Sequence, residues 1–243
     1  MTGLGLRYFW RQLRAPPDTL MLEIGAGGEL LVAKLRAGLS LLLLLLPLVN
    51  IVTGEFSPSE GTAGLLGVVL AVLFSQLWLL LARPPRRLRW LPWATSSYDV
   101  TLTTLVLGLL ALGSPAAGLN SMVVWAFYLV SILMTALRND GRLTLYTGAL
   151  AILQYGALAG VVFHFAHTPE QLASADYGTA RLSNVLQREL LLAIATAITA
   201  TVVFRMQRLV ELSGNDSLTG LPNRTLLVHR CPSLADGARE RGG

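Results

Sequence analysis

Two histidines and two acidic residues are the side chains whose types best suit metal binding or pH sensing. His164 and His167 lie three residues apart at the end of an apolar segment, close to Glu170 and Asp176. A neutral imidazole binds metal ions, and it titrates near physiological pH. Two histidines at the end of a membrane helix are, however, usually only solvated. We therefore expect no metal site here, and a sensory role for the two histidines is the alternative.

Polar residues within apolar segments are the second group of candidates, because such residues are costly in a membrane and often functional. Asn50, Gln76 and Gln154 are uncharged amides that could line a ligand cavity. Hydrogen bonding between helices explains them more simply. Asp99 follows two serines, and we expect it to act as a cap at the N-terminus of a helix rather than as a proton site.

The composition is that of a membrane protein. The chain has 243 residues, of which 53% are hydrophobic and 14% are charged. An ordinary soluble domain has roughly a quarter of its residues charged, so this composition excludes a water-soluble monomer. The single cysteine excludes an intramolecular disulfide. The net charge of +5 would favour nucleic acid in a soluble chain, but the arginines flank apolar segments, so we expect membrane lipid and no nucleic acid as a partner.

The apolar segments predict an all-α bundle of six membrane-spanning helices over residues 35–205. Each span requires about twenty mostly apolar residues, since backbone groups in hydrocarbon must bond within their own segment. The stretch from Gly113 to Gly118 supplies a turn that divides one long uncharged segment into two spans. The six predicted spans cover residues 35–53, 62–82, the two halves of 100–137, 143–165 and 186–204.

The positions of arginine and lysine predict the orientation, because short cytoplasmic loops are enriched in both. Of the 19 such residues, all but Arg181 and Arg188 lie in segments on one predicted side. Both termini are therefore expected in the cytoplasm. Within the basic segment 1–34, arginines at i, i+4 and i+7 from Arg7 predict an amphipathic helix on the inner leaflet. A disordered basic tail is the alternative.

Small residues in the last two spans predict close helix packing. Gly148, Gly156 and Gly160 lie on one stripe of the fifth span, and Ala193 and Ala197 lie on one stripe of the sixth. Small residues at such spacing let helix backbones approach each other in a membrane. The pattern leaves open whether the contact forms within one chain or across a dimer.

The sixth span continues into a predicted signalling helix over residues 206–215, where Met206, Leu209 and Ser213 follow heptad spacing. A helix that runs from the membrane into the cytoplasm can transmit a piston or rotation movement to the segment that follows. The same helix could also pair with a second copy of itself.

A nine-residue motif follows directly, with the sequence Asp-Ser-Leu-Thr-Gly-Leu-Pro-Asn-Arg over residues 216–224. It resembles the D-x-L-T-G-L-x-N-R motif that opens the GGDEF domain of diguanylate cyclases. By this resemblance, residues 216–243 are the N-terminal part of an α/β GGDEF domain. The resemblance also implies that the first and last motif residues pair across a tight turn. The residues that match at fixed positions are Asp216, Leu218, Thr219, Gly220, Leu221, Asn223 and Arg224.

The resemblance implies a nucleotidyltransferase that condenses two GTP molecules into cyclic di-GMP. Each protomer of a dimer would bind one GTP with Mg²⁺. In this family the metal-binding and guanine-binding residues lie further along the chain than the opening motif. We therefore expect no catalytic, cofactor-binding or metal-binding residue in these 243 residues, and no cyclase activity from them alone.

The combined interpretation is a homodimeric sensory region of a diguanylate cyclase in the bacterial inner membrane. It would control cyclic di-GMP synthesis through the helix after the sixth span, and a hydrophobic or periplasmic ligand is compatible with it. One alternative is a small multi-span transporter or channel. Another is the input region of a protein with a degenerate GGDEF domain or with a GGDEF–EAL pair.

Overall fold

The computed structural model describes residues 19–43, 45, 58–83, 88–166 and 168–214, most of which are helical. Within these residues, five helical segments are long and apolar enough to cross a membrane, as expected of a multi-pass membrane protein. The elements are, in chain order, α2 (Thr19–Leu43), α4 (Pro58–Leu81), α5 (Leu91–Gly113), α6 (Pro115–Asn120), α7 (Met122–Met134), the 3-10 helix η1 (Thr135–Arg138), α8 (Gly141–Phe165), the 3-10 helix η2 (Pro169–Leu172), the strands β1 (Ala173–Ser174) and β2 (Gly178–Thr179), and α9 (Leu182–Gly214).

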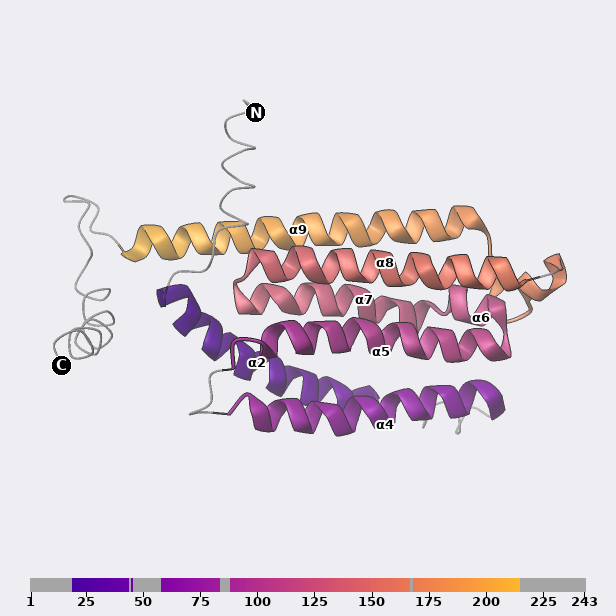
Figure 1. The fold of residues 1–243 in the computed structure, drawn as a ribbon, viewed down its shortest axis with the longest axis horizontal. Coiled ribbons are helices and arrows are strands. Elements are labelled where there is room, and N and C mark those ends of the chain that lie inside the picture. Colours follow the sequence, from indigo (N-terminus) through magenta and orange to yellow (C-terminus); the bar gives the residue numbers. More distant parts are fainter. Residues whose placement is uncertain (1–18, 44, 46–57, 84–87, 167, 215–243) are drawn as a thin grey trace, which may run out of the picture.

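The long helices lie side by side and run in alternating directions (Figure 1). The central helix is α5, which packs against α4, α7 and α8, and α9 covers α7 and α8. Helix α2 crosses the others obliquely and contacts α4 and η1. The α4–α5 and η1–α8 connections lie at one end of the bundle, here named the η1 end. The α5–α6 connection and the β1–β2 hairpin lie at the opposite end, the hairpin end.

The buried core lies where α5, α7, α8 and α9 meet. Its largest side chains are aromatic, namely Trp125 and Tyr128 of α7 and Tyr155 of α8, each at most 1% exposed. The rings of Tyr128 and Tyr155 meet edge to face with their centroids 6.0 Å apart, a favourable arrangement for aromatic pairs. Large apolar side chains also cover the outer surface of the helices, as lipid contact requires.

The chain reverses direction sharply between η1 and α8. Asn139 has a φ of 53°, in the left-handed region that asparagine tolerates better than most residues. The next residue, Asp140, caps α8 because its carboxylate accepts from the backbone N–H groups of Arg142 at 2.9 Å and Leu143 at 3.4 Å. This turn holds Arg138, the last residue of η1, at a defined position at the η1 end.

The hairpin end contains strand structure that the all-α prediction did not include. β1 and β2 pair antiparallel, with Ala173 opposite Thr179. The side-chain amide of Asn120 donates to the backbone oxygen of Tyr177 at 2.9 Å, so the hairpin is attached to the end of α6. The division of the long apolar stretch after Gly113 is confirmed, although the residues that follow form the short helix α6.

The first predicted span, residues 35–53, is described only in part. Helix α2 begins at Thr19, well before the predicted start near Leu35, so part of the predicted N-terminal segment is helical and packed in the bundle. The last part of the predicted span, residues 46–53, lies outside the described residues, as does the predicted amphipathic helix before Pro16. The other five predicted spans correspond to helices, and the first stays a prediction.

Helices α8 and α9 approach closely at Gly148. A Cβ atom at this position would collide with the side chain of Thr196 on α9, and both residues are buried. Glycine therefore sets the distance between the two helices at this point.

The other small residues of the predicted stripes lie at the surface of the single chain. A Cβ atom on Gly156 would meet the carboxylate of Glu189 at 3.0 Å, and one on Gly160 would have no described atom within 4 Å. Ala193 and Ala197 are exposed on α9.

Replacing Gly148 should separate α8 from α9. We expect Gly148→Ala to lower the free energy of unfolding by about 1–3 kcal/mol, the usual cost of overpacking. Gly38→Ala is the control on α2, where a Cβ atom would have no described atom within 4 Å, and it should leave stability unchanged or raise it by up to about 1 kcal/mol because alanine favours helix. Unfolding by SDS titration in detergent micelles measures both values. Equal effects of the two substitutions would contradict the packing described here.

Candidate functional site

A buried ion pair joins α2 to η1 at the η1 end. Nε of Arg138 lies 2.6 Å from Oε2 of Glu29, and the two side chains are 3% and 9% exposed. The same guanidinium donates from Nη2 to Oγ1 of Thr95 at 2.7 Å and from Nη1 to Oγ of Ser96 at 2.6 Å. The charge is thus paired and its donors are distributed over three side chains, which offsets the cost of burying it.

The backbone of α2 comes close to η1 beside this pair. A Cβ atom on Gly28 would collide with the backbone oxygen of Leu137. Glycine at this position therefore allows the approach that brings Glu29 to Arg138. The charged contact and the backbone contact are adjacent in both segments, so they form one junction.

A second ion pair joins α2 to α5. Nε of Arg36 lies 2.8 Å from Oδ1 of Asp99 and Nη2 lies 2.6 Å from Oδ2, the two-point geometry that gives arginine–carboxylate pairs their strength. The side chains are 8% and 15% exposed. The prediction that Asp99 caps a helix is wrong, because α5 begins at Leu91 with Pro92 in its first turn and Asp99 lies well inside the helix.

The two arginines also differ from their predicted environment. Arg36 and Arg138 were expected among the loop charges at the membrane surface, but both are buried between helices and paired with acids. Their charge is therefore neutralised within the protein. The cytoplasmic orientation of the η1 end stays a prediction, which the remaining basic residues support.

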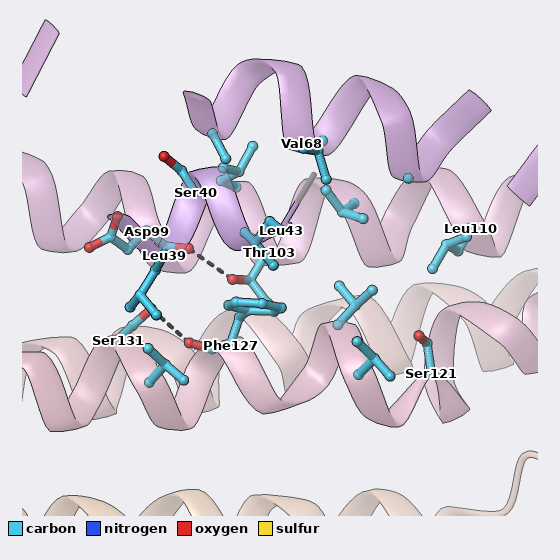
Figure 2. Close-up of a pocket in the computed structure, with 18 of the residues that line it drawn as sticks. Leu39, Ser40, Leu43, Val68, Asp99, Thr103, Leu110, Ser121, Phe127 and Ser131 are labelled. Carbon is cyan, nitrogen blue, oxygen red and sulfur yellow. Dashed lines mark hydrogen bonds between the residues drawn. The ribbon is translucent and has the colours of Figure 1, made fainter. Parts of the chain in front are cut away.

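A long cavity of about 640 Å³ lies between α2, α4, α5 and α7 (Figure 2). Its walls are mostly apolar and include Leu39, Val68, Val106 and Phe127. The Arg36–Asp99 pair lies at one end of the cavity, and the polar residues Asn120, Asp176 and Tyr177 line the other. The volume falls within the range of sites that hold small ligands, roughly 300–1,000 Å³.

Several hydroxyl groups of the cavity wall donate to their own helices, and that of Tyr98 donates to the backbone oxygen of Leu70 on α4 at 3.0 Å. Thr103 donates to the backbone oxygen of Asp99 at 2.9 Å, and Ser131 donates to that of Phe127 at 2.8 Å (dashed lines in Figure 2). Ser40 likewise bonds within α2. Such hydroxyls make the wall polar in places while leaving few donors for a ligand.

The η1 end also connects to α9. Nε2 of Gln207 donates to the backbone oxygen of Asn139 at 2.9 Å, and both residues are buried. Asn139 directly follows Arg138, which pairs with Glu29 on α2. A continuous set of contacts therefore leads from Arg36 at the cavity, along α2 to Glu29, through η1 and to α9.

The predicted amide contacts lie elsewhere in the bundle. Gln154 of α8 accepts from Thr104 at 2.6 Å and donates to Thr101 at 3.0 Å, so the predicted hydrogen bonding between helices is confirmed for this residue. Gln76 is exposed on α4, and Asn50 lies outside the described residues.

Arg188, predicted at the outer end of the sixth span, lies near the start of α9 and bonds to the hairpin end. Its Nη1 donates to the backbone oxygen of Leu119 and its Nη2 to that of Asn120 at 3.2 Å. The guanidinium also lies 5.6 Å from the ring centroid of Trp125. A cation is favourable at the C-terminal end of a helix, so Arg188 stabilises the end of α6.

The histidines show no metal-binding arrangement within the described part of the chain. His164 is exposed and its ring meets that of Phe165 edge to face at 5.2 Å. His167 lies outside the described residues. Among the residues that the structure describes, no group of three or more His, Cys, Asp or Glu side chains could hold a metal ion. The motif at 216–224 also lies outside the described residues.

Glu29 is the site residue that the sequence analysis missed. It lies seven residues before Arg36, which places both on one face of a helix because two turns take about seven residues. Because residues 1–34 are predicted to lie outside the bundle, the sequence predicts no arginine partner for Glu29. A helix predicted to begin upstream of residue 35 would place both charges, Glu29 and Arg36, on one face.

Comparisons with protein-family models, with curated proteins and with solved structures give no match to this chain. The functional interpretation therefore depends on the contacts within the chain. The paired charges, the cavity and the connection to α9 are the three features that it must explain.

Loss of one charge at the η1 end should be strongly destabilising. We expect Glu29→Gln to lower the free energy of unfolding by about 3 kcal/mol, because Arg138 then keeps a buried charge without its counterion. Lys34→Gln is the matched control, since Lys34 is exposed on the same helix, and it should change stability by no more than about 0.5 kcal/mol. SDS titration in micelles reports both. A loss as small for Glu29→Gln as for the control would refute a structural role of the pair.

Proposed function

We propose that this chain is the membrane input region of a bacterial diguanylate cyclase, in which α9 transmits changes in the bundle to a GGDEF domain. The observation that carries the proposal is the continuity of α9, a single helix of 33 residues that ends at Gly214. Two residues further on, Asp216 begins the motif that resembles the opening of a GGDEF domain. Membrane helix and output motif are thus joined almost without a linker.

The length of α9 supports this role. At about 1.5 Å per residue, 33 residues span about 50 Å, whereas the hydrocarbon core of a bilayer is about 30 Å thick. The C-terminal part of α9 projects past the start of α8 at the η1 end (Figure 1). In this proposal the η1 end faces the cytoplasm, where GTP and Mg²⁺ are available to the output domain.

Two of the contacts between α9 and the bundle lie toward the η1 end. Thr196 packs on Gly148 of α8 within the membrane region, and Gln207 bonds to Asn139 beyond η1. A shift of α8 or η1 therefore rotates or translates α9, which is the type of movement that a continuous helix can carry to its far end.

The proposal includes a homodimer in the inner membrane. A GGDEF domain acts as a pair, so two copies of α9 must bring their output domains together. Gly156, Gly160, Ala193 and Ala197 are exposed on α8 and α9, and small exposed residues on membrane helices allow close approach of a second copy.

Changing the helical phase of α9 between the bundle and the output domain tests the proposal. The chain through Arg224 is joined to the remainder of an active GGDEF domain, and one to four alanines are inserted after Leu209, beyond the Gln207 contact. Each added residue rotates the output by about 100° and moves it by about 1.5 Å. We expect cyclic di-GMP synthesis by isolated membranes to change strongly with two inserted residues, and to return toward the starting value with four.

Arg205→Gln without insertion is the matched control, since it keeps the helical phase and Arg205 is exposed on α9 outside the predicted heptad positions. It should leave cyclic di-GMP synthesis unchanged. Equal synthesis from all the insertion variants would mean that α9 is only a tether, and the proposed transmission would be wrong.

A further inference from the structure

We propose that the cavity between α2, α4, α5 and α7 binds an uncharged single-chain amphiphile, whose carbonyl oxygen accepts a hydrogen bond from Nη1 of Arg36. The hydrocarbon chain of the ligand lies along α5 and α7 toward the hairpin end. This inference concerns binding alone and does not depend on the proposed cyclase function.

Arg36 provides the free donor. Its Nε and Nη2 both bond to Asp99, whereas Nη1 has no hydrogen-bond partner among the described residues and is buried, so a ligand oxygen in the cavity reaches it only when the guanidinium shifts. Arg36 lines the cavity and its side chain is 8% exposed. A buried N–H group without an acceptor costs free energy. A ligand oxygen that accepts from Nη1 would remove this cost.

The charges at this end favour an uncharged head group. The Arg36–Asp99 pair is neutral as a unit, and so is the pair that Glu29, also on α2, forms with Arg138 of η1. A carboxylate ligand would add a second negative charge beside Asp99 without a new cation to balance it. Burying such an excess charge is unfavourable. A carbonyl oxygen accepts the hydrogen bond without adding a buried charge.

The shape of the cavity favours a chain. Its wall on α5 extends from Asp99 to Leu110, which corresponds to about 16 Å at 1.5 Å per residue. One leaflet accounts for half of the hydrocarbon thickness of about 30 Å, so the cavity is as long as a lipid chain. Between its polar ends the wall presents mainly apolar side chains, including Leu39, Val106 and Phe127. A fatty acyl ester and an isoprenoid quinone both combine a carbonyl oxygen with such a chain.

Photolabelling of the full chain in lipid nanodiscs tests the proposal. The probe is a methyl ester of a long-chain fatty acid with a diazirine in its chain, and labelled peptides are identified by mass spectrometry. We expect labels on cavity residues such as Val106 and Phe127, with competition by unlabelled methyl palmitate. Hexadecane, which lacks the carbonyl, and the palmitate anion should each compete about tenfold less well. Competition by a quinone instead of the ester would identify the isoprenoid as the source of the same chemistry.

Two variants separate the polar contact from the space that the chain occupies. Arg36→Met combined with Asp99→Leu removes the donor without leaving an unpaired charge, and it should weaken competition by the ester about tenfold, since a hydrogen bond to a charged donor is lost. Val130→Phe narrows the cavity and should also reduce labelling of its wall. Leu133→Phe is the control on the same helix, because Leu133 is 55% exposed and lies outside the cavity lining.

Labels distributed over the outer surface of the helices and insensitive to Val130→Phe would overturn the proposal. Competition by palmitate or hexadecane as strong as that by the ester would overturn the assignment of an uncharged carbonyl head. The single substitution Val130→Phe keeps the test decisive even if the double variant at the ion pair does not fold.

Discussion

A charged side chain between membrane helices must find a partner, and this constraint determines how α2 joins the bundle. Arg138 and Arg36 are both buried, and each is balanced by an acid from a different helix. Without Glu29 and Asp99 their burial would be prohibitive. The pairs fix the position of α2 at two points that are two helical turns apart, and the close approach at Gly28 follows from the same junction.

The paired charges also connect parts of the molecule that could otherwise move independently. Arg36 lines the cavity, whereas Glu29 on the same helix holds Arg138. The turn after Arg138 presents the backbone oxygen to which Gln207 of α9 bonds. In the proposed transmission, a change at the cavity that tilts α2 therefore also moves η1 and α9. Each step of the proposed transmission is a direct contact between neighbouring elements.

Much of the architecture could be predicted because hydropathy and turn residues are local properties of the sequence. The helices after residue 58, the break after Gly113 and the role of Gln154 all followed from such signals. The ion pairs could not be predicted, since they join residues 63 and 109 positions apart. Asp99 was misplaced because α5 starts at Leu91, and the pairing of β1 with β2 involves strands too short for a periodic pattern. The motif at 216–224 stays a prediction from sequence alone.

The central claim is that Glu29 and Arg138 act as one unit that holds α2 to the bundle. A double-mutant cycle with Glu29→Gln and Arg138→Gln tests it most directly, with the free energy of unfolding measured by SDS titration in micelles. Each single change leaves a buried charge without its counterion, whereas the double change leaves none. The account predicts that the double variant is more stable than the sum of the single effects implies, by about 2 kcal/mol or more. Additive effects within about 0.5 kcal/mol would contradict it.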